Sequence, residues 1–148
     1  MRVTDLLARD HREVQDLFTR FEWTTPADGA ARRDLFRQIV QELELHSQAE
    51  EAVFYRAARA ASRRIDDAES GHQHLRNVIA EVEVLEPDSA DFAAGVVVVK
   101  QIVLAHVLEE ESGVFLDAER MGGEELERLG AAFAERKKAL AQEMRRAA

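Results

Sequence analysis

The sequence predicts an all-α protein, an up-down four-helix bundle built from a duplicated helix pair, with a fifth helix at the C-terminus. Three observations lead to this fold class. Between its short polar connectors, the chain is rich in Ala, Leu, Glu, Arg and Gln, which favour helix. Apolar residues recur at three- and four-residue spacing in four successive segments. The first two of these segments are repeated by the next two. The length of 148 residues is typical of a single domain, which would cover residues 1–148.

Polar connectors separate the expected helices. Pro26 and Pro87 each lie in a short polar stretch, where proline ends one helix and Asp, Ser or Thr caps the next. Residues 62–67 are predicted as a loop or a frayed extension of the second helix, and Gly122 and Gly123 break the chain before the last one. The bundle therefore covers about residues 4–119, with helices over about 4–22, 30–61, 70–85 and 89–119, followed by a C-terminal helix over about 124–146 that caps the bundle or forms a dimer.

The run Val96–Val99 is the one place where a strand competes with a helix. Its surroundings keep a helical period, because Phe92, Val96, Val99 and Val103 lie on one face. We interpret it as helix.

An internal repeat gives the two halves a common register. The residues around His11 align with those around His72, and the residues around His46 align with those around His106. His11 is 35 residues from His46, and His72 is 34 residues from His106. The chain is thus two copies of a helix pair.

Six positions on the apolar faces are polar, and they come one or two to each bundle helix. Burying a lone carboxylate costs several kcal/mol unless it is paired or binds a metal. A His and a Glu four residues apart lie on one face of a helix, and two such pairs facing each other can bridge two metals about 3.5–4 Å apart. A single inward His is more often a hydrogen-bonded core residue, but four in duplicated register favour a metal site. The predicted ligands are His11, His46, Glu50, His72, His106 and Glu110.

These residues resemble the hemerythrin-like (HHE cation-binding) family over about residues 4–119. The resemblance rests on His11, His72, His46-x-x-x-Glu50 and His106-x-x-x-Glu110. It implies a four-helix bundle with a non-haem di-iron centre of two iron ions, oxo- or hydroxo-bridged, that reacts with dioxygen, hydrogen peroxide or nitric oxide. Imidazole and carboxylate ligands also suit manganese or zinc, so iron follows from the resemblance alone.

One position departs from the oxygen-carrying hemerythrins. They have a further His one turn after the ligand of the third helix, and here that position is Arg76. The resemblance then implies an open position on both irons, which favours catalase- or peroxidase-like turnover over reversible oxygen storage. The alternatives are a non-enzymatic oxygen or iron sensor or carrier and a purely structural metal bundle, perhaps with zinc.

Tyr55 is a further candidate ligand. On an ideal helix it points about 180° away from His46 and packs against another element, whereas a local bulge would rotate it toward the metals. Its phenolate could then fill one open position. Phe115 occupies the equivalent position in the repeat, so ligation by Tyr55 would make the two irons unequal. His74, Glu51, Glu109 and Glu111 are expected to flank the site rather than to bind metal.

Composition excludes several other classes of protein. A net charge of −9 argues against nucleic-acid binding and against anionic membrane surfaces. The absence of Cys excludes disulfide scaffolds, thiolate metal sites and cysteine nucleophiles. We find no signal peptide and expect no membrane span, because no apolar run approaches 18 residues. These features predict a cytoplasmic monomer or homodimer whose partners are small molecules.

Overall fold

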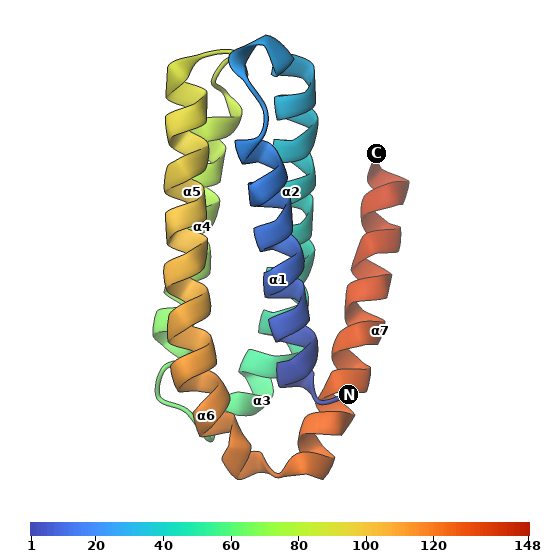
Figure 1. The fold of residues 1–148 in the computed structure, drawn as a ribbon. Coiled ribbons are helices and arrows are strands. Elements are labelled where there is room, and N and C mark those ends of the chain that lie inside the picture. The colour runs from blue at the N-terminus through green and yellow to red at the C-terminus, as the bar shows by residue number, and fades with distance from the viewer.

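The computed structural model describes residues 1–148 and is helical along almost its whole length, with no strand. Four long helices run alternately up and down, and a fifth runs up beside them (Figure 1). The predicted fold class is confirmed, and the run Val96–Val99 is helical. The long helices are α1 (Val3–Glu22), α2 (Gly29–Ala49), α4 (Ile65–Glu83), α5 (Ala90–Glu109) and α7 (Gly123–Ala147).

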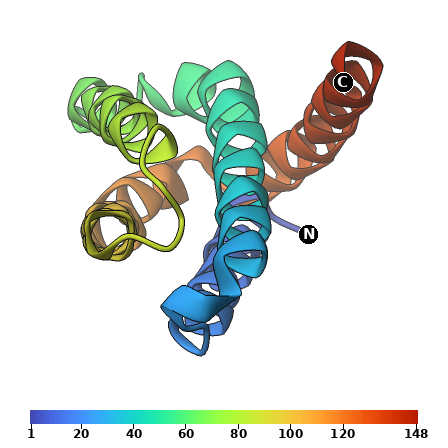
Figure 2. The same ribbon diagram turned by 90° about the horizontal axis from the view of Figure 1, so that it is seen from above.

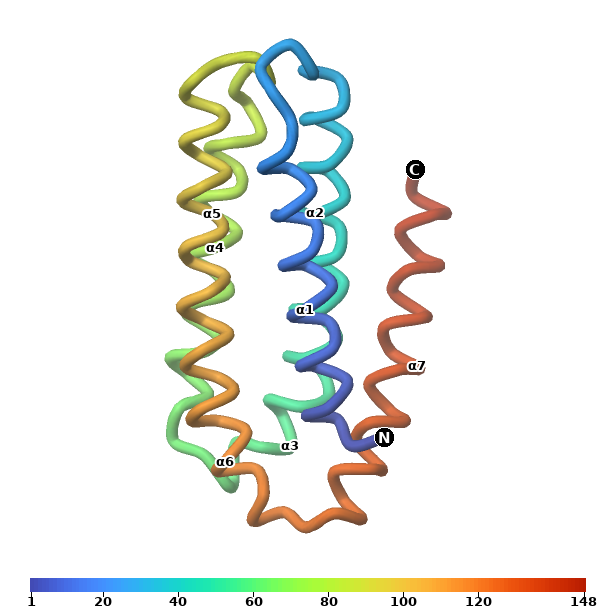
Figure 3. Tube along the Cα trace, in the orientation of Figure 1, coloured from blue at the N-terminus to red at the C-terminus, as the bar shows by residue number.

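Two of these helices contain a π-helical turn at the same place in the repeat. The chain continues from α2 through the π-helix η2 (Glu50–Tyr55) into α3 (Arg56–Ala58). It likewise continues from α5 through the π-helix η3 (Glu110–Val114) into α6 (Phe115–Ala118). Figure 3 shows both passages as unbroken tubes. Each wide turn begins at a glutamate of the polar stripe.

The connectors use the expected residues. Thr25 caps the 3-10 turn η1 (Pro26–Asp28) in a capping box with Asp28. The Ser89 hydroxyl accepts a hydrogen bond of 3.0 Å from the Phe92 amide at the start of α5. At the far end, the 3-10 turn η4 (Glu119–Met121) is followed by Gly122 with φ 88°, a conformation that favours glycine, and the chain then turns back into α7.

The predicted start of the third bundle helix is wrong. We expected residues 70–85, with 62–67 as a loop or a frayed extension of the second helix, whereas α4 begins at Ile65 and ends at Glu83. Ile65 is buried and packs in an apolar cluster with Leu7 and Phe54. Asp66 and Asp67 lie in its first turn, where carboxylates interact favourably with the helix dipole.

Two apolar clusters lie above and below the polar stripe. The upper one lies among the four bundle helices and includes Phe18, Ile39 and Val99. The lower one includes Leu7 and Phe54 together with residues of α7. The stripe residue His11 lies between Leu7 and Val14 in sequence, so its neighbours along the helix belong to different clusters. The bundle core therefore encloses the polar stripe from both ends.

The fifth helix covers one side of the bundle. Seen from above, α7 lies outside the arrangement of α1, α2, α4 and α5, and it packs against α1 and α2 (Figure 2). Leu126, Leu129 and Phe133 place its apolar face in the lower core. Gly130 allows a close approach, because a Cβ at this position would lie 2.1 Å from the Met1 carbonyl oxygen. Of the two roles expected for this helix, the structure shows the capping one.

One helical segment is long and apolar enough, by length and composition only, to be a candidate membrane span. Within Ala90–Met121, one 18-residue window has a mean hydropathy of 1.7, long and apolar enough to cross a membrane. Core helices of soluble proteins pass the same test. Here Phe92, Val96 and Val103 pack in the upper core, while 28% of the window as a whole is buried. The window alone is weak support for a membrane span.

Candidate metal centre

The six polar stripe residues meet in the middle of the bundle as two overlapping groups. In each group, the ligand atoms lie within 4.8 Å of one another. One group combines a His of α1 with a His of α2, and the other combines a His of α4 with a His of α5. The two glutamates at the starts of the π-helices belong to both groups. The groups are His11, His46, Glu50 and Glu110, and Glu50, His72, His106 and Glu110.

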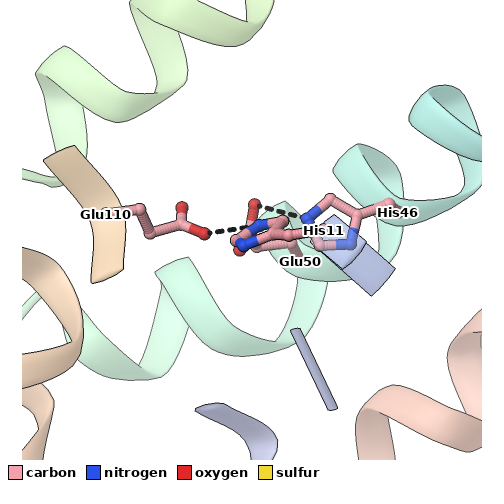
Figure 4. A group of neighbouring side chains, drawn as sticks. All are labelled: His11, His46, Glu50 and Glu110. Carbon is pink, nitrogen blue, oxygen red and sulfur yellow. Dashed lines mark ion pairs between the residues drawn. The ribbon is translucent and has the colours of Figure 1, made fainter. Parts of the chain in front are cut away.

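In the first group, each imidazole faces one carboxylate. Nε2 of His11 lies 3.3 Å from Oε1 of Glu110, and Nε2 of His46 lies 3.5 Å from Oε1 of Glu50. Figure 4 shows these two approaches, with Glu110 coming from the opposite side of the bundle to Glu50. Three different helices thus converge on one point.

The second group repeats this arrangement with tighter spacing. Nε2 of His72 lies 3.2 Å from Oε1 of Glu50, and Nε2 of His106 lies 3.3 Å from Oε2 of Glu110. The two Nε2 atoms are 3.1 Å apart. Two imidazole nitrogens and two carboxylates thus point at the same small volume.

Several of these buried atoms have no hydrogen-bond partner. Nε2 of His11, Nε2 of His46, both carboxylate oxygens of Glu50 and Oε1 of Glu110 are buried and unsatisfied. Leaving such groups unpaired costs about 1–3 kcal/mol each, and more for a charge. Cations between the imidazoles and carboxylates would satisfy all of these atoms at once. The residues therefore fit metal ions, and this donor set suits iron, manganese or zinc.

The π-helix η2 brings Tyr55 into the centre. The Tyr55 side chain is fully buried, and its hydroxyl donates a hydrogen bond to Glu110. The hydroxyl oxygen also lies 3.4 Å from Nε2 of His72 and 3.4 Å from Nε2 of His106. The ideal-helix placement of Tyr55 is therefore wrong, and the bulge that would turn it inward is confirmed.

The repeat places Tyr55 and Phe115 at equivalent positions on opposite halves of the centre. The Tyr55 ring stacks on His72, with centroids 5.3 Å apart, and the Phe115 ring stacks on His11, with centroids 6.2 Å apart. One half therefore has a phenol next to its imidazoles and the other half has a hydrocarbon ring. This difference makes the two halves chemically unequal.

Outer carboxylates form hydrogen bonds with two of the four imidazoles and lie near a third. Nδ1 of His11 lies 3.0 Å from Glu111, and Nδ1 of His46 lies 3.0 Å from Asp10. Nδ1 of His72 faces Glu51 at 3.6 Å. Partners of this kind orient a ligating imidazole and increase its basicity. Glu51 and Glu111 were expected beside the site. The role of Asp10 was not predicted, because its only signal in the sequence is its place next to His11.

Two further polar residues, both expected to flank the site, lie outside the centre. His74 and Glu109 are exposed, as expected for flanking residues. Arg76, which stands where oxygen carriers have a further His, forms an ion pair of 2.7 Å with Glu51. Arg76 therefore supports the outer carboxylate of His72.

When no cation is present, the neighbouring carboxylates raise the pKa of His46 and of His72. Burial alone would lower the pKa of His46, but Glu50 and Asp10 outweigh it and raise this pKa to about 10. For His72, Glu50 and Glu51 likewise overcome burial and raise the pKa to about 9.

The opposite holds for Glu50, where burial would raise the pKa but His46 and His72 hold it well below its usual value. Burial and the two glutamates raise the pKa of Tyr55, so its hydroxyl keeps its proton.

Comparison with known proteins relates the chain to one family. The hemerythrin HHE cation-binding domain matches residues 2–116. A hemerythrin HHE cation-binding domain-containing protein from Mycobacterium kansasii has the same fold, with a TM-score of 0.85 and 21% sequence identity, covering 94% of this chain and 86% of that one. A DNA nickase from Nostoc sp. is 28% identical over 117 residues, which are 78% of this chain and 33% of that protein. The chain thus spans about a third of the length of this curated relative.

Proposed function

Because the chain belongs to the hemerythrin HHE cation-binding domain family, we propose that it holds two iron ions and uses them to consume hydrogen peroxide, nitric oxide or dioxygen. One iron would take His11 and His46, and the other His72 and His106. Glu50 and Glu110 would bridge the two, together with an oxo or hydroxo group. When bound, the iron pair would supply redox chemistry, because its ions can accept electrons from one substrate molecule and donate them to another.

The observation that carries this proposal is the set of unsatisfied buried atoms around the shared centre. Both oxygens of Glu50 lack a hydrogen-bond partner although the side chain is fully buried. A carboxylate in that state is expected to be paired or metal-bound. Glu50 and Glu110 each belong to both ligand groups, which is the arrangement that two bridged metals require.

The chain's own residues would orient the ligands and exclude water. Asp10 and Glu111 hold the outer nitrogens of two imidazoles, so these rings have a fixed direction. Apolar clusters above and below the centre keep bulk water away from it. Tyr55 holds a proton at its hydroxyl, next to Glu110, and is proposed as an additional ligand on the His72 side once that proton leaves.

Turnover is favoured over oxygen storage by Arg76. A further His at this position would add a ligand to the His72 side, but Arg76 instead pairs with Glu51. The proposed iron pair therefore has fewer protein ligands than that of an oxygen carrier. A non-enzymatic oxygen or iron sensor would use the same ligands. The enzyme and the sensor would therefore differ in whether they consume substrate, and not in their metal content.

The experiment measures iron content and then gas evolution. We expect two iron ions per chain in protein loaded with iron, and oxygen evolution when hydrogen peroxide is added. His46→Ala should lose both, whereas His74→Ala, a change of an exposed His outside the centre, should keep both. Two irons without consumption of peroxide or nitric oxide would favour the sensor. Retention of zinc alone would favour a structural bundle.

A further inference from the structure

The two halves of the centre differ in how they meet solvent. The repeat aligns Asp10 of α1 with Gly71 of α4. Asp10 contacts Nδ1 of His46, but Gly71 has no side chain, and Nδ1 of the equivalent His106 has no hydrogen-bond partner. A Cβ on Gly71 would lie 3.4 Å from that Nδ1 atom. The carboxylate that closes one half is therefore missing from the other.

A cavity of about 280 Å³ lies at this open position. His106 and Glu110 line it together with Ala68 and Val114. Among the candidate ligands, His106 is the most exposed, with 15% of its side chain accessible, whereas Glu110 is 1% exposed. The cavity thus leads from the surface to a carboxylate that belongs to both ligand groups.

The opposite side of the centre is closed. Phe115 stacks on His11, and the His11 outer nitrogen is bonded to Glu111. The outer nitrogen of His46 contacts Asp10, and Asp10 forms an ion pair of 2.9 Å with Lys137 of α7. A second cavity of about 430 Å³ lies on this side. Asp10 is among its lining residues, but none of the candidate metal ligands is.

The mouth of the cavity carries unbalanced negative charge. Arg64, Asp67 and Glu109 line it, and all three are exposed. The Arg64 guanidinium is paired with Asp117 at 3.4 Å, whereas Asp67 and Glu109 take part in no ion pair. Carboxylates at a narrow opening repel anions and leave uncharged molecules unaffected.

We propose that small molecules reach the metal centre through this cavity beside His106, and that its acidic mouth favours uncharged ligands over anions. This inference rests on the proposed function for the presence of the metals. It assigns the selecting role to Asp67 and Glu109, neither of which is a proposed ligand. The substrate class is therefore small and neutral, such as hydrogen peroxide or nitric oxide.

The charge at the mouth is tested on the full iron-loaded chain with azide as the anion and nitric oxide as the neutral probe. Association rates are measured by stopped-flow absorbance. The double variant Asp67→Asn/Glu109→Gln should bind azide roughly threefold to tenfold faster at low ionic strength, and added salt should remove the difference. Arg64→Gln should slow azide by a similar factor. Nitric oxide should keep its rate in both variants.

Arg63→Gln is the matched control for Arg64→Gln. Arg63 is the exposed neighbour of Arg64, so both changes remove one positive charge, but Arg63 does not line this cavity. Equal effects of the two substitutions on azide would show that only net charge matters and would overturn the selecting role of the mouth.

The route itself is tested by filling the cavity. Ala68→Leu should slow both azide and nitric oxide while iron stays at two ions per chain. Ala134→Leu, which fills the second cavity beside α7, should change neither rate. If both probes bind Ala68→Leu at the original rate with two irons present, the route is wrong. Absence of iron from the unmodified protein would instead overturn the proposed function. Should Ala68→Leu fail to fold, the substitutions at Asp67, Glu109 and Arg64 still test whether anions reach the metal centre through this cavity.

Discussion

Nζ of Lys137 in α7 lies 2.9 Å from Oδ1 of Asp10 in α1. The other oxygen of Asp10 is 3.0 Å from Nδ1 of His46, so Lys137 of the fifth helix is linked to a candidate metal ligand through this carboxylate. Burial alone would raise the pKa of Asp10, but His46 and Lys137 outweigh it and lower this pKa. The last helix therefore does more than cover apolar surface.

We expect Lys137→Met to lower the free energy of unfolding by about 1–2 kcal/mol, because it leaves a mostly buried carboxylate with one partner fewer. Denaturant unfolding of the metal-free protein measures this. Lys138→Met is the control, since Lys138 is exposed and forms no ion pair. Equal stability of the two variants would show that the Lys137 contact contributes nothing.

Tyr55→Phe removes a buried hydroxyl that donates to Glu110. In the metal-free protein, the loss of this donor should cost about 1–2 kcal/mol of unfolding free energy. In the iron-loaded protein, the variant should keep two irons but lose the visible phenolate-to-iron absorption band. A spectrum identical to that of the unmodified protein would exclude Tyr55 as a ligand.

The metal-free protein should lose stability as the pH rises. His46 and His72 have pKa values raised from 6.5 to about 10 and about 9. A His whose pKa is higher in the folded than in the unfolded protein stabilises the fold. This stabilisation is complete at a pH below the pKa of the unfolded state, and it is lost as the pH rises through the pKa of the folded state. Unfolding free energy should therefore fall between about pH 6.5 and 10.

The same series on the metal-loaded protein is the control for this pH dependence. In the metal-loaded protein a cation takes the place of the imidazole protons, so the unfolding free energy should fall less as the pH rises. Thermal unfolding across the pH range gives both curves. A metal-free protein as stable at high pH as near neutrality would show that these imidazoles carry no stabilising proton.

Gly130→Ala should weaken the packing of α7 on the start of α1. The new Cβ would lie 2.1 Å from the Met1 carbonyl oxygen and 3.1 Å from the Val3 nitrogen, so backbone has to move. We expect a loss of about 1–3 kcal/mol, seen as a lower Tm. Gly123→Ala is the control, because its Cβ would meet only the flexible end of Arg2, and it should change Tm little.

Much of the bundle follows from helix periodicity. His11 and Glu50 could be assigned to an inward face because apolar residues at three- and four-residue spacing surround them. The repeat then paired them with His72 and Glu110. The structure brings all of these together, and the resemblance to the hemerythrin-like family is confirmed by the match over residues 2–116.

What the sequence could not settle depends on contacts between helices. Periodicity gives no reason for Asp10 to face His46, since that contact depends on how α1 packs on α2. Tyr55 points inward only because a π-helical turn rotates it, and an ideal 3.6-residue period places it outward. The start of α4 was missed for a similar reason, because Ile65 is buried by residues distant in sequence.

Anomalous diffraction at the iron edge, on crystals of the iron-loaded chain, locates the proposed ions. We expect two peaks inside the bundle, one between His11 and His46 and one between His72 and His106, with Glu50 and Glu110 contacting both. Absence of any peak among these side chains, or iron bound only at the protein surface, would contradict the proposed iron pair.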